Sequence, residues 1–203
     1  MIEQLKRVIK LLDNLSKLSS DNHSTFTRKE LKTQFSNYDL SKMEKNNDIE
    51  RSERGIYTLN DYLPDMFSIY QLKYQRGIYC LNTALYLLDF SDRYPDKLDM
   101  MFPQGYNTSK ISTQISAHTQ LSKYFDLGII KVKTMNGNEV KTYSLERTLA
   151  EILRPQNHVD PDIVTNAYKK WANRKNKDIG ELFLFAQKFK TINQVQSYLD
   201  VVL

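Results

Sequence analysis

Ten side chains between residues 28 and 54 have the chemistry of a surface that contacts DNA. Lysine and arginine pair with phosphates, whereas asparagine, tyrosine and serine hydrogen-bond to phosphates or base edges. Two adjacent cations at an expected helix start oppose the usual preference for acidic residues there, and a bound phosphate would explain them. The candidates are Arg28, Lys29, Lys32, Asn37, Tyr38, Ser41, Lys42, Lys45, Arg51 and Arg54.

The residue types within this set indicate a division of roles. Asn37, Tyr38 and Ser41 are the candidates for reading bases, and Arg51 and Arg54 lie where an arginine can enter a minor groove. The other cations are expected to contact phosphates. Because acidic residues are interleaved, a solvated face of mixed charge is the alternative interpretation for any single cation. Those acidic residues are Glu44, Asp48, Glu50 and Glu53.

Two short helices are expected to position these side chains. Thr27 and Glu30 have the spacing of a capping box, which begins a helix by satisfying its first backbone amides. After a polar turn, Asp39 or Ser41 is expected to cap a second helix that runs through Lys45.

A hairpin is expected after the two helices. Residues 50–55 are polar, contain Gly55 and lie between Ile49 and Ile56, which is the pattern of a hairpin tip. Residues 2–18 carry apolar side chains at spacings of three and four, which predicts an amphipathic helix before the pair. The order helix, helix, hairpin is that of a winged helix-turn-helix, which places its second helix in the major groove of DNA.

A second group of cations lies in the ten residues from Tyr168 to Lys177. This stretch contains no acidic residue and includes Trp171, the one tryptophan of the chain. Basic and aromatic residues together suit a nucleic acid or a phosphorylated partner. The alternative is a helix with Tyr168 and Trp171 packed inward and its cations in water. The cations are Lys169, Lys170, Arg174, Lys175 and Lys177.

The sequence lacks the common signatures of catalysis. It has no glycine-rich phosphate loop, no G-x-S-x-G or H-E-x-x-H motif, and no pair of cysteines for zinc. We therefore expect no enzymatic activity, cofactor, metal or catalytic residue. Asp160 and Asp162 flank Pro161 in a pattern that helix capping explains. Four aspartates around Arg93 resemble a metal or acid-base cluster, with loop boundaries as the simpler interpretation. They are Asp89, Asp92, Asp96 and Asp99.

Composition limits the class of protein without naming a function. The chain has 203 residues, a net charge of +5 and a pI of 9.1, which permit a polyanionic partner. It has no apolar run long enough to span a membrane and begins without a secretory leader, so we expect a cytoplasmic protein. The single cysteine, Cys80, excludes an intramolecular disulfide and is expected to be a buried thiol.

The remainder of the chain alternates between strand and helix signals. A strand is expected at 97–102, and a hairpin at 129–133 and 140–143 around the Asn136-Gly137 turn. The expected fold class is α+β, with an N-terminal winged helix-turn-helix (residues 1–60) followed by a larger α+β domain (residues 61–203) with a helical C-terminal tail. Helices are expected at 66–74, 81–88, 145–153, from Asp160 onward, 179–189 and 192–202.

Five segments in order carry a family resemblance. They are residues 26–31, 54–57, 82–92, 101–106 and 143–154, the last reading Tyr-Ser-Leu-Glu-Arg-Thr-Leu-Ala-Glu-Ile-Leu-Arg. Together they resemble the AbiEi antitoxins of bacterial abortive-infection toxin–antitoxin systems, which act in phage defence.

The resemblance implies a transcriptional autorepressor that is also an antitoxin. Its winged helix would bind inverted repeats of double-stranded DNA in the operon's own promoter, as cooperating monomers or a weak dimer. Its C-terminal domain would neutralise a nucleotidyltransferase-like toxin in a type IV arrangement, without a stable complex. Two alternatives are a small metal-dependent enzyme and a partner-binding protein that uses the winged helix as an interaction module.

Overall fold

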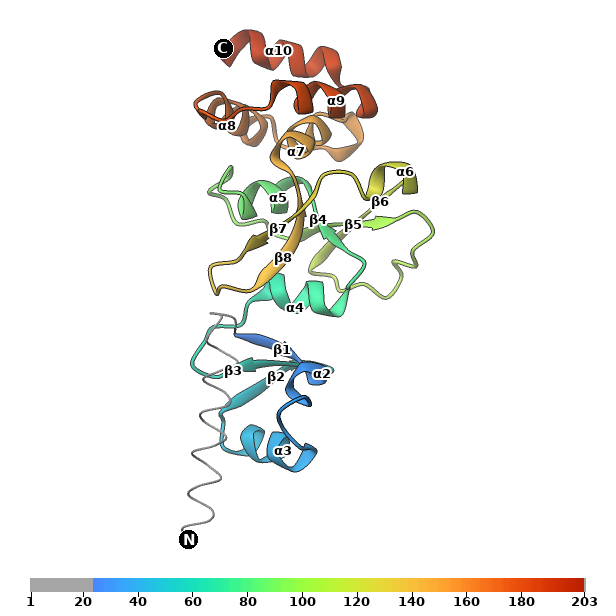
Figure 1. Cartoon of the computed structure of the whole chain (residues 1–203). Coiled ribbons are helices and arrows are strands. Elements are labelled where there is room, and N and C mark those ends of the chain that lie inside the picture. Colours follow the sequence, from blue (N-terminus) through green and yellow to red (C-terminus); the bar gives the residue numbers. More distant parts are fainter. Residues whose placement is uncertain (1–23, 203) are drawn as a thin grey trace. The chain divides into compact units, whose positions relative to one another are not determined.

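The chain forms two compact units in the computed structural model, which describes residues 24–202 (Figure 1). In this part, the first unit comprises residues 24–75 and Lys133–Val140, and the second comprises Arg76–Val132 and residues 141–202. Both units combine helices with a β-sheet, so the expected α+β class is confirmed. The helix expected at residues 2–18 lies outside the described residues, and the domain boundary expected after residue 60 stays a prediction.

The first unit is a small sheet covered by helices. Its elements are β1 (Thr25–Thr27), α2 (Arg28–Leu31), α3 (Asn37–Lys45), β2 (Ile49–Glu53), β3 (Ile56–Leu59) and α4 (Met66–Lys73). The strands pair in the antiparallel order β1-β3-β2, so β3 is central. Phe26 of β1, Met43 of α3 and Tyr57 of β3 belong to one buried apolar cluster. This core fixes α2 and α3 against the sheet because burial of their apolar faces is the main stabilising term.

Capping boxes begin both short helices. The one expected at Thr27 and Glu30 is confirmed, with the Glu30 carboxylate 2.7 Å from the Thr27 amide. The expected cap of the second helix was wrong, because Ser36 caps α3 in place of Asp39 or Ser41. The Ser36 hydroxyl accepts a hydrogen bond from the Asp39 amide at 3.2 Å, and the Asp39 carboxylate accepts one from the Ser36 amide at 3.1 Å.

The hairpin of β2 and β3 has a shorter tip than the sequence predicted. Strand β2 continues to Glu53, and the turn consists of Arg54 and Gly55. Gly55 has a φ of +78°, a conformation that side chains with a Cβ rarely adopt. Arg54 is therefore held at the apex of the hairpin.

A distant segment completes the first unit through buried polar contacts. Asn138 is 3% exposed, and its side-chain oxygen accepts hydrogen bonds from the backbone amides of Ser24 at 3.0 Å and Thr25 at 3.2 Å. Its side-chain nitrogen donates to Asp65 at 2.6 Å, and the Thr134 hydroxyl donates to the same carboxylate at 2.5 Å. We call Ser24, Asp65, Thr134 and Asn138 the Asn138 network. It joins the start of β1 to the N-terminus of α4, which Asp65 caps.

The second unit is built on a five-stranded mixed sheet with helices packed on it. The strand order is β6-β5-β4-β8-β7, with β4 antiparallel to β5, and with β5–β6 and β4–β8 as parallel pairs. Its elements are β4 (Ile78–Tyr79), α5 (Leu81–Leu87), β5 (Leu98–Pro103), β6 (Ile115–Gln120), α6 (Ser122–Phe125), β7 (Ile129–Lys133), β8 (Glu139–Tyr143), α7 (Leu145–Ile152), the 3-10 helix η1 (Pro155–Asn157), α8 (Pro161–Ala172), α9 (Ile179–Phe189) and α10 (Ile192–Val202).

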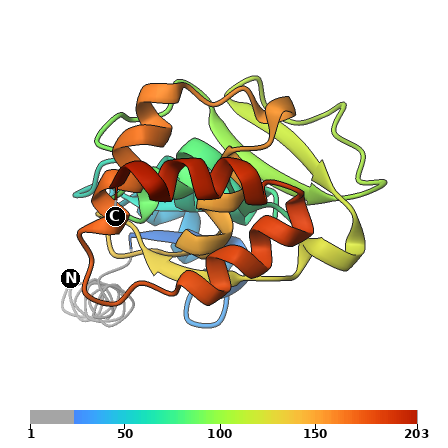
Figure 2. The same ribbon diagram turned by 90° about the horizontal axis from the view of Figure 1, so that it is seen from above.

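The C-terminal helices form a bundle on α7. Helix α9 packs on α7, and α10 packs on both α8 and α9, as the orange and red helices of Figure 2 show. Leu149, Trp171 and Phe185, from three of these helices, belong to one buried core. Cys80 is in the same core as expected, and burial raises the pKa of its thiol well above the usual value.

Candidate nucleic-acid interface

Arg28 connects the three parts of the first unit that carry the candidate DNA-contacting residues. Its backbone amide, at the start of α2, donates a hydrogen bond to the Gly55 carbonyl in the hairpin turn at 2.8 Å. Its guanidinium donates to the Asn37 side-chain oxygen, at the start of α3, at 3.2 Å. The starts of α2 and α3 and the β2–β3 turn are therefore held together by one residue.

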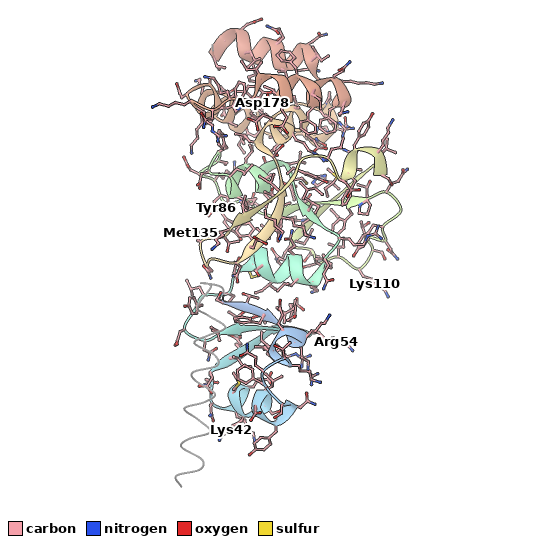
Figure 3. All side chains as sticks on the ribbon, viewed as in Figure 1. Lys42, Arg54, Tyr86, Lys110, Met135 and Asp178 are labelled. Atoms are coloured by element: carbon pink, nitrogen blue, oxygen red, sulfur yellow. The ribbon has the colours of Figure 1, made fainter. Side chains whose placement is uncertain are left out.

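The predicted cations of the first unit are accessible. Lys42 is half-buried and the other six are exposed. Figure 3 shows Lys42 on α3 and Arg54 at the β2–β3 turn. Within residues 24–202, no ion pair engages any of the seven, so their charges are not neutralised by protein carboxylates. They are Arg28, Lys29, Lys32, Lys42, Lys45, Arg51 and Arg54.

Several acidic residues of this region are engaged elsewhere. Glu30 and Asp39 complete the two capping boxes, and Glu53 forms an ion pair with Lys73 at 2.6 Å. In contrast, Glu44 and Glu50 line a shallow depression together with Arg51. Arg51 therefore has two acidic residues in the same depression, although none of the described ion pairs joins them to it.

The three candidates for reading bases differ in their surroundings. Asn37 accepts the bond from Arg28, and the Ser41 hydroxyl donates to the Asn37 carbonyl at 3.0 Å, as a serine inside a helix commonly does. Tyr38, in the first turn of α3, is 66% exposed. Tyr38 is thus the largest of these three side chains, and most of its surface is exposed to solvent.

The second basic stretch forms the end of α8 and the loop after it. Tyr168 and Trp171 are fully buried, which confirms that both aromatic side chains pack inward. The Tyr168 hydroxyl donates to the Leu149 carbonyl at 3.2 Å, and the Trp171 indole donates to Glu146 at 3.1 Å. Lys177 is half-buried and donates to the Ala172 carbonyl. Four cations remain exposed: Lys169, Lys170, Arg174 and Lys175.

The aspartates considered as a metal cluster do not converge. Asp99 is buried and lies 2.8 Å from the His118 ring, whereas the Asp92 side chain is fully exposed and pairs with Lys170 at 3.6 Å. Asp160 caps α8 as expected, accepting from the Asp162 amide at 2.9 Å. In the described part of the chain, no group of three or more His, Cys, Asp or Glu side chains has a metal-binding arrangement. None of the helices in residues 24–202 has the length and apolar character needed to cross a bilayer.

Two supporting residues were missed by sequence reasoning. Ser36 follows the S-x-x-D pattern, which is a local signal for an N-cap, but the pattern competes with Asp39 and Ser41 nearby. Asn138 gives no local signal beyond its place after the Asn136-Gly137 turn, because its partners lie 73 and more residues away.

Comparison with known proteins identifies a similar fold. No family model matches the chain, and no curated protein matches it either. Among solved structures, the crystal structure of the RV2827C protein from Mycobacterium tuberculosis is similar, with a TM-score of 0.50 over 91% of this chain and 78% of that one. At 11% sequence identity, this similarity shows a shared fold alone.

Proposed function

We propose that this protein is a DNA-binding autorepressor whose first unit is a winged helix-turn-helix. In this proposal α3 is the recognition helix and the β2–β3 hairpin is the wing. The observation that carries the proposal is the double role of Arg28, which ties the start of α3 and the hairpin turn to its own cationic helix. Such a connection places several cations and a helix start close to one another, which favours phosphate recognition.

The topology of the first unit supports this assignment. A strand, two short helices and a two-stranded hairpin follow one another, and the first strand pairs beside the hairpin in the order β1-β3-β2. In winged helices, such a sheet supports the recognition helix in the major groove. The exposed cations without ion pairs favour a polyanion over an apolar partner.

The resemblance to AbiEi antitoxins extends the proposal to the second unit. We infer that the protein represses its own operon by binding inverted repeats, and that its second unit neutralises a nucleotidyltransferase-like toxin without a stable complex. The protein would then act as a cytoplasmic binding protein in bacterial phage defence, without catalysis. The motifs at residues 82–92 and 143–154, which resemble segments of that family, support the antitoxin part of the proposal.

A double charge reversal tests the DNA-binding face. Lys42→Glu with Arg54→Glu should abolish gel-shift binding to the DNA upstream of the gene, because it replaces two attractions to phosphate with two repulsions. Lys97→Glu with Lys110→Glu, at exposed positions of the second unit, is the control with the same charge change. Equal binding by the two double variants, both folded by circular dichroism, would refute the assignment of the face.

The antitoxin part needs a separate readout. Cells that express the toxin of the same operon should survive when they also express the Lys42→Glu, Arg54→Glu variant. In the same cells, a reporter under the operon's promoter should lose repression. Loss of both protection and repression would contradict the assignment of DNA binding to the first unit and toxin neutralisation to the second.

A further inference from the structure

An ion pair attaches the β2–β3 hairpin to α4 at the residue before the hairpin turn. The Lys73 ammonium lies 2.6 Å from a Glu53 carboxylate oxygen, and both side chains are about one-third exposed. Glu53 is the last residue of β2, so it directly precedes the turn of Arg54 and Gly55. Both partners of the ion pair belong to the first unit. The pair therefore connects the apex of the hairpin to a helix of the same unit.

The pairing of β2 with β3 is irregular just before this turn. From Glu50 to Glu53, β2 advances by three residues while β3 advances by two, which is a β-bulge in β2. A bulge interrupts the ladder of backbone hydrogen bonds, bends the strand and increases its twist. Beyond the bulge, a single register pair, Glu53 with Ile56, precedes the turn. Contacts outside the ladder must therefore supply part of what holds the hairpin apex.

Two such contacts join the apex to helices. The Glu53–Lys73 ion pair leads to α4, and the Gly55 carbonyl accepts the 2.8 Å hydrogen bond from the Arg28 amide at the start of α2. Burial lowers the pKa of the Lys73 ammonium, but the hydrogen bond to Glu53 leads the interactions that raise it, and the net change is upward. Lys73 therefore stays charged at neutral pH, and the ion pair persists there.

We propose that Glu53 and Lys73 are positioning residues for Arg54, the arginine that the hairpin apex presents to DNA. This inference rests on the proposed function of the first unit. Arg54 follows Glu53 directly, so the ion pair restrains the backbone that carries the Arg54 side chain. A restrained apex loses less conformational entropy when its arginine binds a phosphate or enters a minor groove. In this role, the Glu53 carboxylate increases affinity for DNA although its charge alone would decrease it.

The positioning role and simple electrostatics predict opposite effects of one substitution. Glu53→Gln removes a negative charge beside Arg54 and releases Lys73 from its partner, so charge alone predicts tighter binding to DNA. The positioning role predicts weaker binding, because the apex loses its connection to α4. Glu50→Gln is the matched control, with the same change of charge at an exposed position of the same strand. Within residues 24–202, no ion pair engages Glu50.

The first measurement is operator affinity by fluorescence anisotropy, on the full chain and the DNA upstream of its gene. Glu53→Gln should bind roughly two- to fivefold more weakly than the wild type, as expected from the loss of a partly exposed ion pair. Glu50→Gln should bind as tightly as the wild type or more tightly, and Lys73→Arg, which keeps the ion pair, should bind like the wild type. In an Arg54→Ala background, Glu53→Gln should cause no further loss, because the arginine that it positions is absent.

The second measurement needs no DNA. The Arg28 amide is at the first position of α2, where an amide has no acceptor in its own helix, so its protection from hydrogen exchange reports on the bond to the Gly55 carbonyl. Glu53→Gln should accelerate exchange of this amide, as followed by NMR, whereas Glu50→Gln should leave it unchanged. Circular dichroism checks that each variant is folded.

Three results would overturn the proposal. They are operator binding by Glu53→Gln that equals or exceeds that of the wild type, a loss that persists in the Arg54→Ala background, and unchanged exchange of the Arg28 amide. Absence of operator binding by the wild type would instead refute the DNA-binding function, and with it the recognition role of Arg54. The exchange measurement would still decide whether the ion pair positions the hairpin apex, so the two failures are distinguishable.

Discussion

At the scale of single residues, Arg28 combines a positioning role with a proposed recognition role. Its guanidinium holds Asn37 at the start of α3, a candidate for reading bases. Arg28→Ala should therefore weaken binding to scrambled DNA through the lost phosphate contact, and weaken operator binding by about 1 to 3 kcal/mol more. Because the side chain is exposed, the free energy of unfolding should change by no more than about 0.5 kcal/mol.

Lys29→Ala is the matched comparison for this prediction. Lys29 is exposed beside Arg28 and lacks a contact to α3 among the described hydrogen bonds, so it should act as a phosphate contact only. Its loss should weaken operator and scrambled DNA equally. If Arg28→Ala also weakened both equally in anisotropy titrations, the positioning role of Arg28 would be wrong.

Cys80 gives a prediction about pH and reactivity. Burial raises the pKa of its thiol above the unfolded value of about 8.5, so the folded chain retains the proton at higher pH than the unfolded chain. The free energy of unfolding should therefore fall as pH rises above about 8.5. Alkylation of the native protein at pH 8 should proceed only at the rate of unfolding, as mass spectrometry can follow. Rapid stoichiometric labelling without denaturant would contradict the buried site.

Residue types were readable from the sequence, but their surroundings were not. The ten candidates between residues 28 and 54 follow from chemistry and spacing. Their partners depend on the folded backbone. The Ser41 hydroxyl donates to the Asn37 carbonyl, and the Trp171 indole donates to Glu146. For Tyr168 and Trp171 the sequence left two interpretations open, and burial decided between them.

At the scale of elements, the Asn138 network predicts a large effect of one buried side chain. Asn138→Ala would leave two backbone amides without their acceptor and would remove one of the donors to the Asp65 carboxylate. Unsatisfied buried groups cost about 1 to 3 kcal/mol each, so we expect a loss of stability of roughly 3 kcal/mol in chemical denaturation. The first unit should lose structure before the second.

Asn136→Ala is the control in the same turn. Asn136 donates one exposed hydrogen bond to the Leu63 carbonyl at 2.6 Å, so its removal should cost less than about 1 kcal/mol. Equal destabilisation by the two substitutions would show that the turn itself, and not the Asn138 network, stabilises the first unit.

Elements with strong local signals were predictable. Helices α9 and α10 match the expected ranges, and Asp160 with Pro161 begins α8 as expected. Strands β4 and β6 were not anticipated. The former has two residues, and the latter lies at a sheet edge, where polar serine, histidine and threonine hide the alternation of a strand.

At the scale of the whole molecule, the grouping of segments could not be read from the sequence. Residues Lys133–Val140 belong to the first unit although the strands around them belong to the sheet of the second. This grouping depends on contacts such as that between Asn138 and Ser24, 114 residues apart. A truncation after residue 75 would lack the Asn138 network, so DNA binding should be measured on the full chain.

The contribution of the first unit's cations to operator affinity should appear as a dependence of that affinity on salt concentration. Seven cations of the first unit are available for phosphates. If six or more engage, affinity should fall by about three orders of magnitude between roughly 50 and 200 mM salt. A slope near zero would indicate a binding mode that does not use these cations.

The central claim is sequence-specific DNA binding by the first unit, and a gel-shift titration tests it most directly. The purified full chain is titrated onto the DNA immediately upstream of its own gene, with scrambled DNA as competitor. The account predicts specific retardation, in two cooperative steps if inverted repeats are present, and its loss in the Lys42→Glu, Arg54→Glu variant. Absence of a specific shift at low salt would contradict the repressor function and remove DNA as the partner of the first unit.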